Sequence, residues 1–239
     1  MTVRSAQLSE ATYAPGIINR ENVYRSVKRA LDVVIALALI VLLAPLMALI
    51  AILVKLESRG PAIFRQERVR GDLDRSDRKA SARTFTFLKF RSMHQDADPR
   101  VHQRFVERLI EDGSDARRQG NGLYKLSNDP RVTRVGRVIR ALSLDELPQL
   151  FNVLRGDMSL VGPRPAMPYE VAKYRRWHRQ RLEAPAGITG LWQVSGRNSL
   201  PFDEMVRLDN HYVEKRSLRL DLAILVKTIP VVIFGHNGC

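Results

Sequence analysis

Several common sources of function are missing from this sequence. Its single cysteine, Cys239, is the last residue, so neither a disulfide framework nor a cysteine-rich metal site can form within the chain. The residues before Cys239 do not form a prenylation motif. The five histidines are scattered, and no Walker, GxGxxG, GxSxG or HExxH pattern occurs. Residues 1–24 lack a compact apolar core, so a cleaved signal peptide is not expected.

Acidic side chains are scarce relative to basic ones. The 239 residues include 39 Lys and Arg against 25 Asp and Glu, which gives a formal net charge of +14 at pH 7. This charge favours polyanionic partners, which include nucleic acids, anionic lipid headgroups and phosphorylated substrates. Composition alone does not choose among the three. The apolar fraction of 45% is sufficient for a packed core.

The longest uncharged stretch extends from Val33 to Val54 and contains 22 residues. As a helix with a rise of about 1.5 Å per residue it would be roughly 33 Å long, which is enough to cross the hydrocarbon core of a bilayer. We therefore expect a membrane-embedded helix in this stretch.

Two features argue against a simple crossing. Pro45 lies just past the centre of the stretch, where it removes a backbone hydrogen bond and predicts a kink. Basic residues, which are enriched on the cytoplasmic side of membrane proteins, flank the stretch at both ends; they are Arg20, Arg25, Lys28 and Arg29 before it and Lys55, Arg59, Arg65, Arg68 and Arg70 after it. A re-entrant helix that enters and leaves through one leaflet explains both features. A kinked spanning helix is the alternative.

The remaining chain predicts short elements. Its patterns favour strands at 62–64 and 84–90, and helices at 101–111, 131–140, 145–154 and 167–182. Residues 71–82 are polar and predict a surface loop, whereas two prolines make Gly162–Pro165 a rigid turn. Residues 218–234 are apolar but interrupted by charges and by Pro230, which suits an interfacial helix or a packed C-terminal core helix.

The sharpest local constellation is Ser143-Leu144-Asp145-Glu146. Adjacent carboxylates at the start of a helix suit phosphoryl transfer, because one can attack phosphorus while its neighbour holds Mg²⁺. The same four residues also match a capping box, in which Ser143 is the N-cap and Glu146 bonds back to it. Taken in isolation, the capping box is the simpler interpretation, although Pro148 disturbs its geometry.

Basic residues in apolar or Gly/Pro-rich segments supply the missing context. An arginine in such a segment is costly unless it meets an anion, and its planar fork matches phosphate. The residues are Lys89, Arg91, Arg137, Arg140, Arg155, Arg164 and Arg197. Near the last of them, glycines permit turns or a close approach to a ligand, and Trp192 between them is expected to pack in the core rather than stack on a base.

Three stretches together resemble the bacterial sugar transferase family, the monotopic polyprenyl-phosphate phosphoglycosyl transferases. They are KFRSM at 89–93, DPRVTRVGRVIRALSLDELPQLFNVLRGDMSLVGPRP at 129–165, and GITGLWQVSGRN at 187–198. The resemblance covers roughly residues 26–233, and the run through SLDELPQLFN and GPRP is highly specific. The later stretch LDNHYVEKRSLRLDLAILVKTIPVV looks like members that transfer glucose- or galactose-1-phosphate.

The resemblance implies an α/β fold that is mostly helical with short strands. Its expected parts are an N-terminal polar segment (1–25), a re-entrant membrane helix broken at Pro45 (26–57), a cytoplasmic catalytic domain (58–200) and a C-terminal interfacial helical segment (201–239). Pro163 and Pro165 would be structural residues, like Pro45.

The resemblance also implies a reaction. Asp145 would be the nucleophile that attacks the β-phosphate of a UDP-sugar, releases UMP and keeps a phosphosugar on its carboxylate, and undecaprenyl phosphate would then accept the phosphosugar. Glu146 matches the Mg²⁺ ligand, so Mg²⁺ is the expected cofactor. Four basic residues match positions associated with the phosphates or with the architecture of the site, namely Lys89, Arg140, Arg164 and Arg197.

The expected setting is the cytoplasmic face of the bacterial inner membrane, in the first membrane step of exopolysaccharide, capsule or O-antigen synthesis. The partners would be the UDP-sugar, undecaprenyl phosphate and membrane lipids, without nucleic acid; the sequence leaves the sugar and homo-oligomerisation open. Two departures concern substrate recognition: residues 183–187 replace the usual Arg-Pro-Gly, and the loop at 71–82 is long. The competing hypotheses are a membrane-tethered nucleic-acid binder, for which no binding fold is apparent, and a non-catalytic scaffold.

Overall fold

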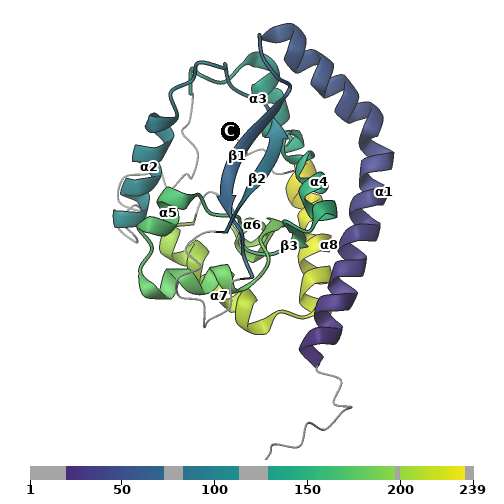
Figure 1. Cartoon of the computed structure of the whole chain (residues 1–239), viewed down its shortest axis with the longest axis vertical. Coiled ribbons are helices and arrows are strands. Elements are labelled where there is room, and N and C mark those ends of the chain that lie inside the picture. Colours follow the sequence, from purple (N-terminus) through teal and green to yellow (C-terminus); the bar gives the residue numbers. More distant parts are fainter. Residues whose placement is uncertain (1–19, 73–82, 113–128, 197–199, 235–239) are drawn as a thin grey trace, which may run out of the picture.

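The longest element is helix α1, Arg20–Glu57, which lies along one side of the molecule (Figure 1). The computed structural model of the chain describes residues 20–72, 83–112, 129–196 and 200–234. The helix ends at Glu57 as predicted but begins six residues before the predicted start at 26. The helix is continuous through Pro45 and not broken there, contrary to the prediction, and it curves along its length (Figure 1).

Helix α1 has one face packed on the protein and a broad apolar face without cover. Ala36, Ile50 and Val54 are buried, whereas Val41 and Leu42 are 69% and 73% exposed. The stretch Glu21–Glu57 is long and apolar enough to cross a membrane, and only 11% of its most apolar 18-residue window is buried. A helix in the core of a soluble protein would be covered on all sides, so the bare face is suited to lipid.

Strands β1 (Ile63–Val69) and β2 (Thr84–Phe90) form an antiparallel hairpin in which Ile63 pairs with Phe90 and Val69 with Thr84. Strand β2 has the predicted bounds; Phe85 and Phe87 alternate with exposed threonines and are buried on one face, while Leu88 and Phe90 are buried on the other. The strand predicted at 62–64 is the start of the longer β1. A second, parallel pair consists of β3 (Ser159–Val161) and β4 (Gly187–Thr189).

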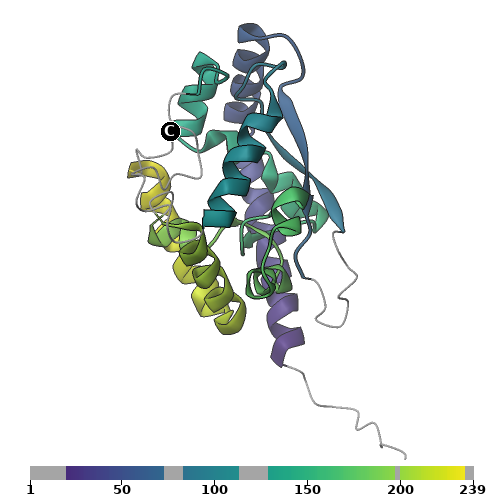
Figure 2. The ribbon, with the colours of Figure 1, turned by 90° about the vertical axis from the view of Figure 1, so that its left-hand side faces the viewer.

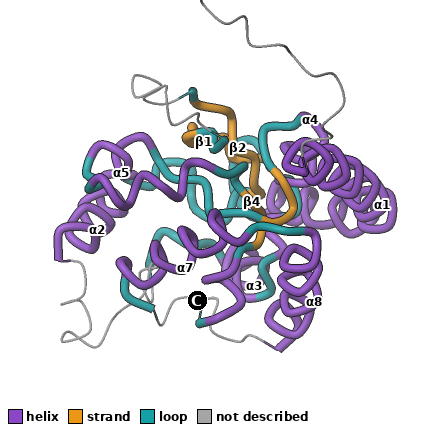
Figure 3. The backbone as a smooth tube through the Cα atoms, turned by 90° about the horizontal axis from the view of Figure 1, so that it is seen from below, coloured by secondary structure: helices purple, strands orange, loops and turns teal. Residues whose placement is uncertain are grey.

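Helices surround these two strand pairs. They are α2 (Pro99–Asp112), α3 (Arg134–Ala141), α4 (Gln149–Arg155), α5 (Pro168–Ala172), α6 (Leu191–Ser195), α7 (Phe202–Lys215) and α8 (Leu218–Phe234). Figure 2 shows the hairpin on one side of the domain and the C-terminal helices on the other. Figure 3 shows α1 and α8 at one end of the molecule and α2 and α5 at the other. The α/β fold is therefore mostly helical with short strands, as expected.

Two predicted helices are divided in the structure. The stretch 145–154 consists of a 3-10 turn, η2 (Leu144–Glu146), followed by α4. The division falls at Pro148, whose missing N–H suits the start of a helix. The stretch 167–182 consists of α5 and a 3-10 helix, η3 (Arg176–Glu183). Here Arg175 is extended and its N–H donates to Nδ1 of His178 at 3.2 Å, so the prediction of one helix is wrong.

Helix α8 combines features of the two structures predicted for residues 218–234, an interfacial helix and a packed core helix. Asp221 and Ile224 are buried against the domain, at 6% and 1% exposure, whereas Leu222 is 63% exposed. Its inner face therefore packs on the core while an apolar outer face remains uncovered, an arrangement that suits a helix at the membrane interface.

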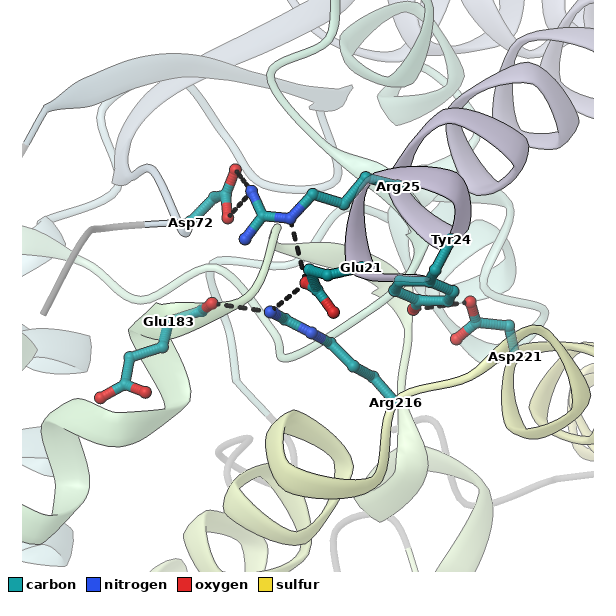
Figure 4. A network of polar contacts seen from close by, with 7 residues as sticks. All are labelled: Glu21, Tyr24, Arg25, Asp72, Glu183, Arg216 and Asp221. Carbon is teal, nitrogen blue, oxygen red and sulfur yellow. Dashed lines mark hydrogen bonds and ion pairs between the residues drawn. The ribbon is translucent and has the colours of Figure 1, made fainter. Parts of the chain in front are cut away.

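Polar contacts tie the first turns of α1 to residues far along the chain (Figure 4). Arg216, which follows α7, contacts Glu21 at 2.6 Å and donates to the carbonyl of Glu183 at 3.0 Å. The buried carboxylate of Asp221 accepts hydrogen bonds from Tyr24 and Tyr212 at 3.0 and 2.7 Å. It also pairs with Lys28 of α1 at 3.0 Å. The N-terminal end of α1 is thus fixed to the C-terminal helices.

Candidate active site

The two adjacent carboxylates lie on the single turn η2, between α3 and α4. Asp145 is buried at 8% exposure, whereas Glu146 is half-buried and lines a cavity. Ser143 before them has a left-handed backbone, with φ of 56°, and makes no side-chain capping bond. The capping-box interpretation is therefore wrong. Positive φ is uncommon for residues other than glycine and concentrates at functional sites.

Lys89 on β2 is half-buried, and several charged groups lie around it. Burial is the main reason why its pKa is lowered to about 8. The carboxylate of Asp145 acts in the opposite direction. Three guanidinium groups add to the lowering, those of Arg68, Arg164 and Arg140. The structure thus gathers one carboxylate and several cations from four separate stretches of chain.

Arg140 reaches this group from the last turn of α3. Its Nη1 atom is buried, and no hydrogen-bond partner for that atom occurs among the described residues. A buried guanidinium nitrogen without a partner is costly, so this atom is available to an anion. The C-terminal end of a helix also stabilises a cation, which favours Arg140 in this position.

Arg164 is held by the turn that follows β3. Pro163 and Pro165 on either side of it are buried. The turn is fixed to the other parallel strand, because Gly162 N–H donates to the Thr189 carbonyl at 2.9 Å and Gly187 N–H to the Pro163 carbonyl at 2.8 Å. A side chain at Gly162 would lie 2.1 Å from the carbonyl oxygen of Pro185, so only glycine fits there. The arginine is therefore presented by a rigid backbone.

Arg68 on β1 is a member of this group that the sequence did not single out. It is 3% exposed, its Nη1 donates to the Pro165 carbonyl at 2.9 Å, and its guanidinium lies 5.1 Å from the centre of the Phe87 ring. It therefore holds the turn that carries Arg164. The sequence signal for Arg68 is weak, because its local pattern shows only one of several basic residues that flank the apolar stretch.

Two other predicted positions have different outcomes. Arg197 lies outside the described residues, so its relation to the group stays a prediction. Trp192 on α6 is 4% exposed and packs in the core, as expected. The loop at 71–82 also lies largely outside the described part of the chain.

A cavity of about 270 Å³ adjoins the carboxylates. Glu146 and Arg164 contribute charged groups to its lining. Leu39 of α1 and Leu225 of α8 contribute apolar groups. The cavity therefore borders the two helices that carry uncovered apolar faces.

The carboxylates of this site are the possible ligands for Mg²⁺. Among the described residues there is no group of three or more His, Cys, Asp or Glu that could hold a metal ion. Mg²⁺ needs no such group, because it is bound through one or two carboxylates together with water and substrate phosphates. Glu146, half-buried at the cavity beside the neighbouring Asp145, fits this type of site.

The chain matches known proteins over most of its length. The profile of the family described as "Bacterial sugar transferase" matches residues 23–235. The exopolysaccharide production protein ExoY of Sinorhizobium fredii is 40% identical over 211 residues, which cover 88% of this chain and 87% of the relative.

Two further relatives carry substrate names. The UDP-glucose:undecaprenyl-phosphate glucose-1-phosphate transferase of Caulobacter vibrioides is 42% identical over 220 residues, which cover 88% of this chain and 71% of the relative. The undecaprenyl-phosphate galactose phosphotransferase of Salmonella typhimurium is 42% identical over 209 residues, which cover 87% of this chain but only 41% of that longer protein.

Proposed function

The chain belongs to the bacterial sugar transferase family, and we propose that it transfers glucose- or galactose-1-phosphate from a UDP-sugar to undecaprenyl phosphate. Relatives named as undecaprenyl-phosphate glucose and galactose transferases support this choice of donor sugar and acceptor. The similarity to an exopolysaccharide production protein supports a place in the first membrane step of exopolysaccharide, capsule or O-antigen synthesis.

The proposed reaction has two displacements at phosphorus. A carboxylate oxygen of Asp145 attacks the β-phosphorus of the UDP-sugar, the bond to the bridging oxygen breaks, and UMP leaves with that oxygen. The acceptor phosphate then attacks the phosphorus of the phosphosugar, and the bond to Asp145 breaks to restore the carboxylate. Such covalent catalysis divides one difficult transfer into two easier steps.

The single observation that carries this proposal is the charge environment of Lys89, which interacts with the carboxylate of Asp145 and with the guanidinium groups of Arg140 and Arg164. The three cations neutralise the negative charge that a diphosphate brings towards a carboxylate, and without them the two anions would repel each other. Arg164 and Arg140 are held by a rigid turn and a helix end, so little reorganisation is needed when the substrate binds.

Glu146 would hold Mg²⁺ together with the substrate phosphates. When bound, the ion neutralises charge on the diphosphate. The residues of the chain supply the remaining functions in this proposal: Asp145 forms the bond to phosphorus, and the basic residues bind and orient the phosphates.

We also propose that α1 is re-entrant and that the active site faces the cytoplasm at the inner membrane. The domain is attached to α1 on both sides of its apolar stretch. Arg29 donates to the Val153 carbonyl at 2.5 Å, and Glu57 accepts from Arg134 N–H at 2.7 Å. A straight crossing would place these two contacts on opposite sides of a hydrocarbon core about 30 Å thick. Shallow placement in one leaflet keeps the polar domain on one side.

UMP release from UDP-sugars by the solubilised protein tests the reaction. The parent protein should release UMP and gain the mass of one hexose-phosphate on the peptide that contains Asp145. Asp145→Asn should show neither, whereas Asp98→Asn, a matched change at an exposed carboxylate, should retain both. UMP release by Asp145→Asn at the parent rate would contradict the assigned nucleophile.

A further inference from the structure

The cavity beside Glu146 and Arg164 is lined mostly by apolar side chains, which do not bind phosphate. Most of the residues that line it are aliphatic, and they come from η2, α4, β3, β4, α1 and α8. Leu39 enters from α1, while Leu225, Thr228, Val231 and Val232 enter from α8. The charged groups therefore lie at a cavity whose other walls are suited to a hydrocarbon.

The walls formed by α1 and α8 are also the ones that carry uncovered apolar surface. On α8, Leu225, Thr228 and Val232 recur at helical spacing and line the cavity. A second stripe on the same helix, Leu222, Val226 and Ile229, is 63%, 58% and 59% exposed. One face of α8 is thus turned to the cavity and the other to the surroundings of the protein.

Leu39, which lines the cavity, belongs to the apolar stretch that we expect to lie in the membrane. It lies six residues inside the apolar stretch that begins at Val33, about 9 Å along the helix from its start. Neighbouring residues on the outer face of α1, among them Val34 and Val41, are 65% and 69% exposed. The cavity therefore lies between two helices whose outer faces are suited to lipid.

We propose that this cavity holds the isoprene units nearest the phosphate of the acceptor, and that the rest of the chain leaves the protein between α1 and α8. The inference rests on the proposed function, because it takes undecaprenyl phosphate as the acceptor. The acceptor phosphate would lie at Arg164, with the first isoprene units against Leu39, Leu225 and Val231. In this arrangement α8 is the wall that selects the lipid.

The dimensions of the cavity favour this occupant over the donor. At about 270 Å³ it is smaller than the roughly 300–1,000 Å³ of pockets that enclose drug-sized ligands. A nucleotide sugar is too large for it and would leave its hydroxyl groups against aliphatic side chains. The hydroxyl groups of Thr189 on β4 and Thr228 on α8 line the cavity but form a hydrogen bond to each other at 2.8 Å. A few isoprene units need no hydrogen bonds and fit the space.

The two half-reactions separate the acceptor from the donor. We would compare Leu225→Trp and Val231→Trp, which fill the cavity, with Val226→Trp on the outer stripe of the same helix. The KM for undecaprenyl phosphate should rise at least about tenfold in the two cavity variants, the low end of the discrimination that one methylene group provides in an apolar pocket. It should not change in Val226→Trp. The burst of UMP from UDP-sugar alone should keep its amplitude in all three.

Equal KM values for the acceptor in cavity and outer variants would overturn the inference, and so would a loss of the UMP burst confined to the cavity variants. Absence of a burst from the parent protein would contradict the proposed covalent route instead, so the two failures can be distinguished.

A binding measurement is independent of turnover. Trp192 lines the cavity, and Trp177 is the other tryptophan of the chain. In a Trp177→Phe background, a short isoprenyl phosphate with a nitroxide on its chain should quench the emission of Trp192 more strongly than a nitroxide-labelled phosphatidylcholine at the same mole fraction. Equal quenching by the two probes would mark the cavity as a general lipid site and overturn the assignment.

Discussion

The ammonium group of Lys89 must keep its proton to attract phosphate, and its pKa is lowered to about 8. As the pH rises through that value the free protein loses a positive charge beside Asp145. We expect kcat/KM for the UDP-sugar to fall above about pH 8, because this parameter reports ionisations of the free enzyme. The measurement is a pH profile of initial UMP release.

Lys89→Arg separates this titration from other alkaline effects. A guanidinium stays charged far above pH 8, so the variant should be less active but should lose the alkaline limb. The same limb in the variant would show that another group is responsible for it.

Arg68 is predicted to be a positioning residue. Its hydrogen bond to the Pro165 carbonyl supports the turn that presents Arg164. Arg68→Gln should lower kcat/KM for UMP release by about tenfold to a hundredfold, because small displacements of a binding group have effects of that size. Arg65→Gln, an exposed arginine on the same strand, is the matched control.

A purely structural role for Arg68 would lower the amount of folded protein without changing the KM for the UDP-sugar in the folded fraction. A positioning role predicts a raised KM, with partial rescue by Arg68→Lys. An Arg68→Gln variant that keeps the parent values of kcat and KM would contradict the prediction.

The side chains of the site differ in how far sequence could predict them. Asp145, Glu146, Lys89, Arg140 and Arg164 were predicted through the motifs around them, and their roles stay predictions. The structure places the charges of Asp145, Arg140 and Arg164 around Lys89, and Glu146 lines a cavity with Arg164. Arg68 was not, since its role depends on a hydrogen bond to a backbone carbonyl nearly a hundred residues away. The left-handed backbone at Ser143 was also not predicted, because the local pattern matched a helix cap.

At the scale of elements, the C-terminal end of α1 organises the start of α3. The carboxylate of Glu57 accepts hydrogen bonds from Arg134 N–H at 2.7 Å and from Val135 N–H at 3.0 Å. It therefore caps a helix that begins 77 residues later. On the other side, Arg91 donates to the carbonyls of Val54 and Ser58 at 3.2 and 2.7 Å. The negative carboxylate of Glu57 thus lies at the N-terminal end of α3, and the positive guanidinium of Arg91 lies at the C-terminal end of α1. Each charge is opposite to that of the helix dipole at the end where it lies.

Glu57→Gln should therefore weaken α3. A loss of about 1 kcal/mol is expected for a capping charge, which corresponds to a decrease in Tm of about 2–4 °C for a chain of this size. UMP release should also decrease, because α3 carries Arg140. Thermal unfolding in detergent measures the first effect, and Glu67→Gln on the exposed side of β1 is the control. An unchanged Tm would mean that the cap contributes nothing to stability.

Two elements have the bounds that the sequence predicted. Strand β2 and helix α8 have the predicted bounds, because alternating or continuous apolar residues define them. The divisions at Pro148 and Arg175 were missed, since they depend on local backbone geometry within stretches whose composition favours helix. The 38-residue length of α1 exceeds its apolar stretch because charged residues on its first turns find partners in the domain.

For the whole molecule, the attachment of both ends of α1 to one domain predicts that both ends lie on one side of the membrane. In a Cys239→Ser background, Ser26→Cys and Arg59→Cys place thiols at exposed positions near the two ends of the apolar stretch. An impermeant maleimide should label neither thiol in intact spheroplasts and both after lysis. Labelling of one thiol in intact cells would contradict the re-entrant topology.

The contact between Lys28 and Asp221 joins residues 193 positions apart. At about 5–20 residues per second, a ribosome needs roughly 10 to 40 s to make the intervening chain. Throughout that interval helix α1 exists without the carboxylate that Lys28 will contact in the folded protein. Helix α8 therefore completes the packing of helix α1, and premature termination before residue 221 should yield a chain that proteases remove.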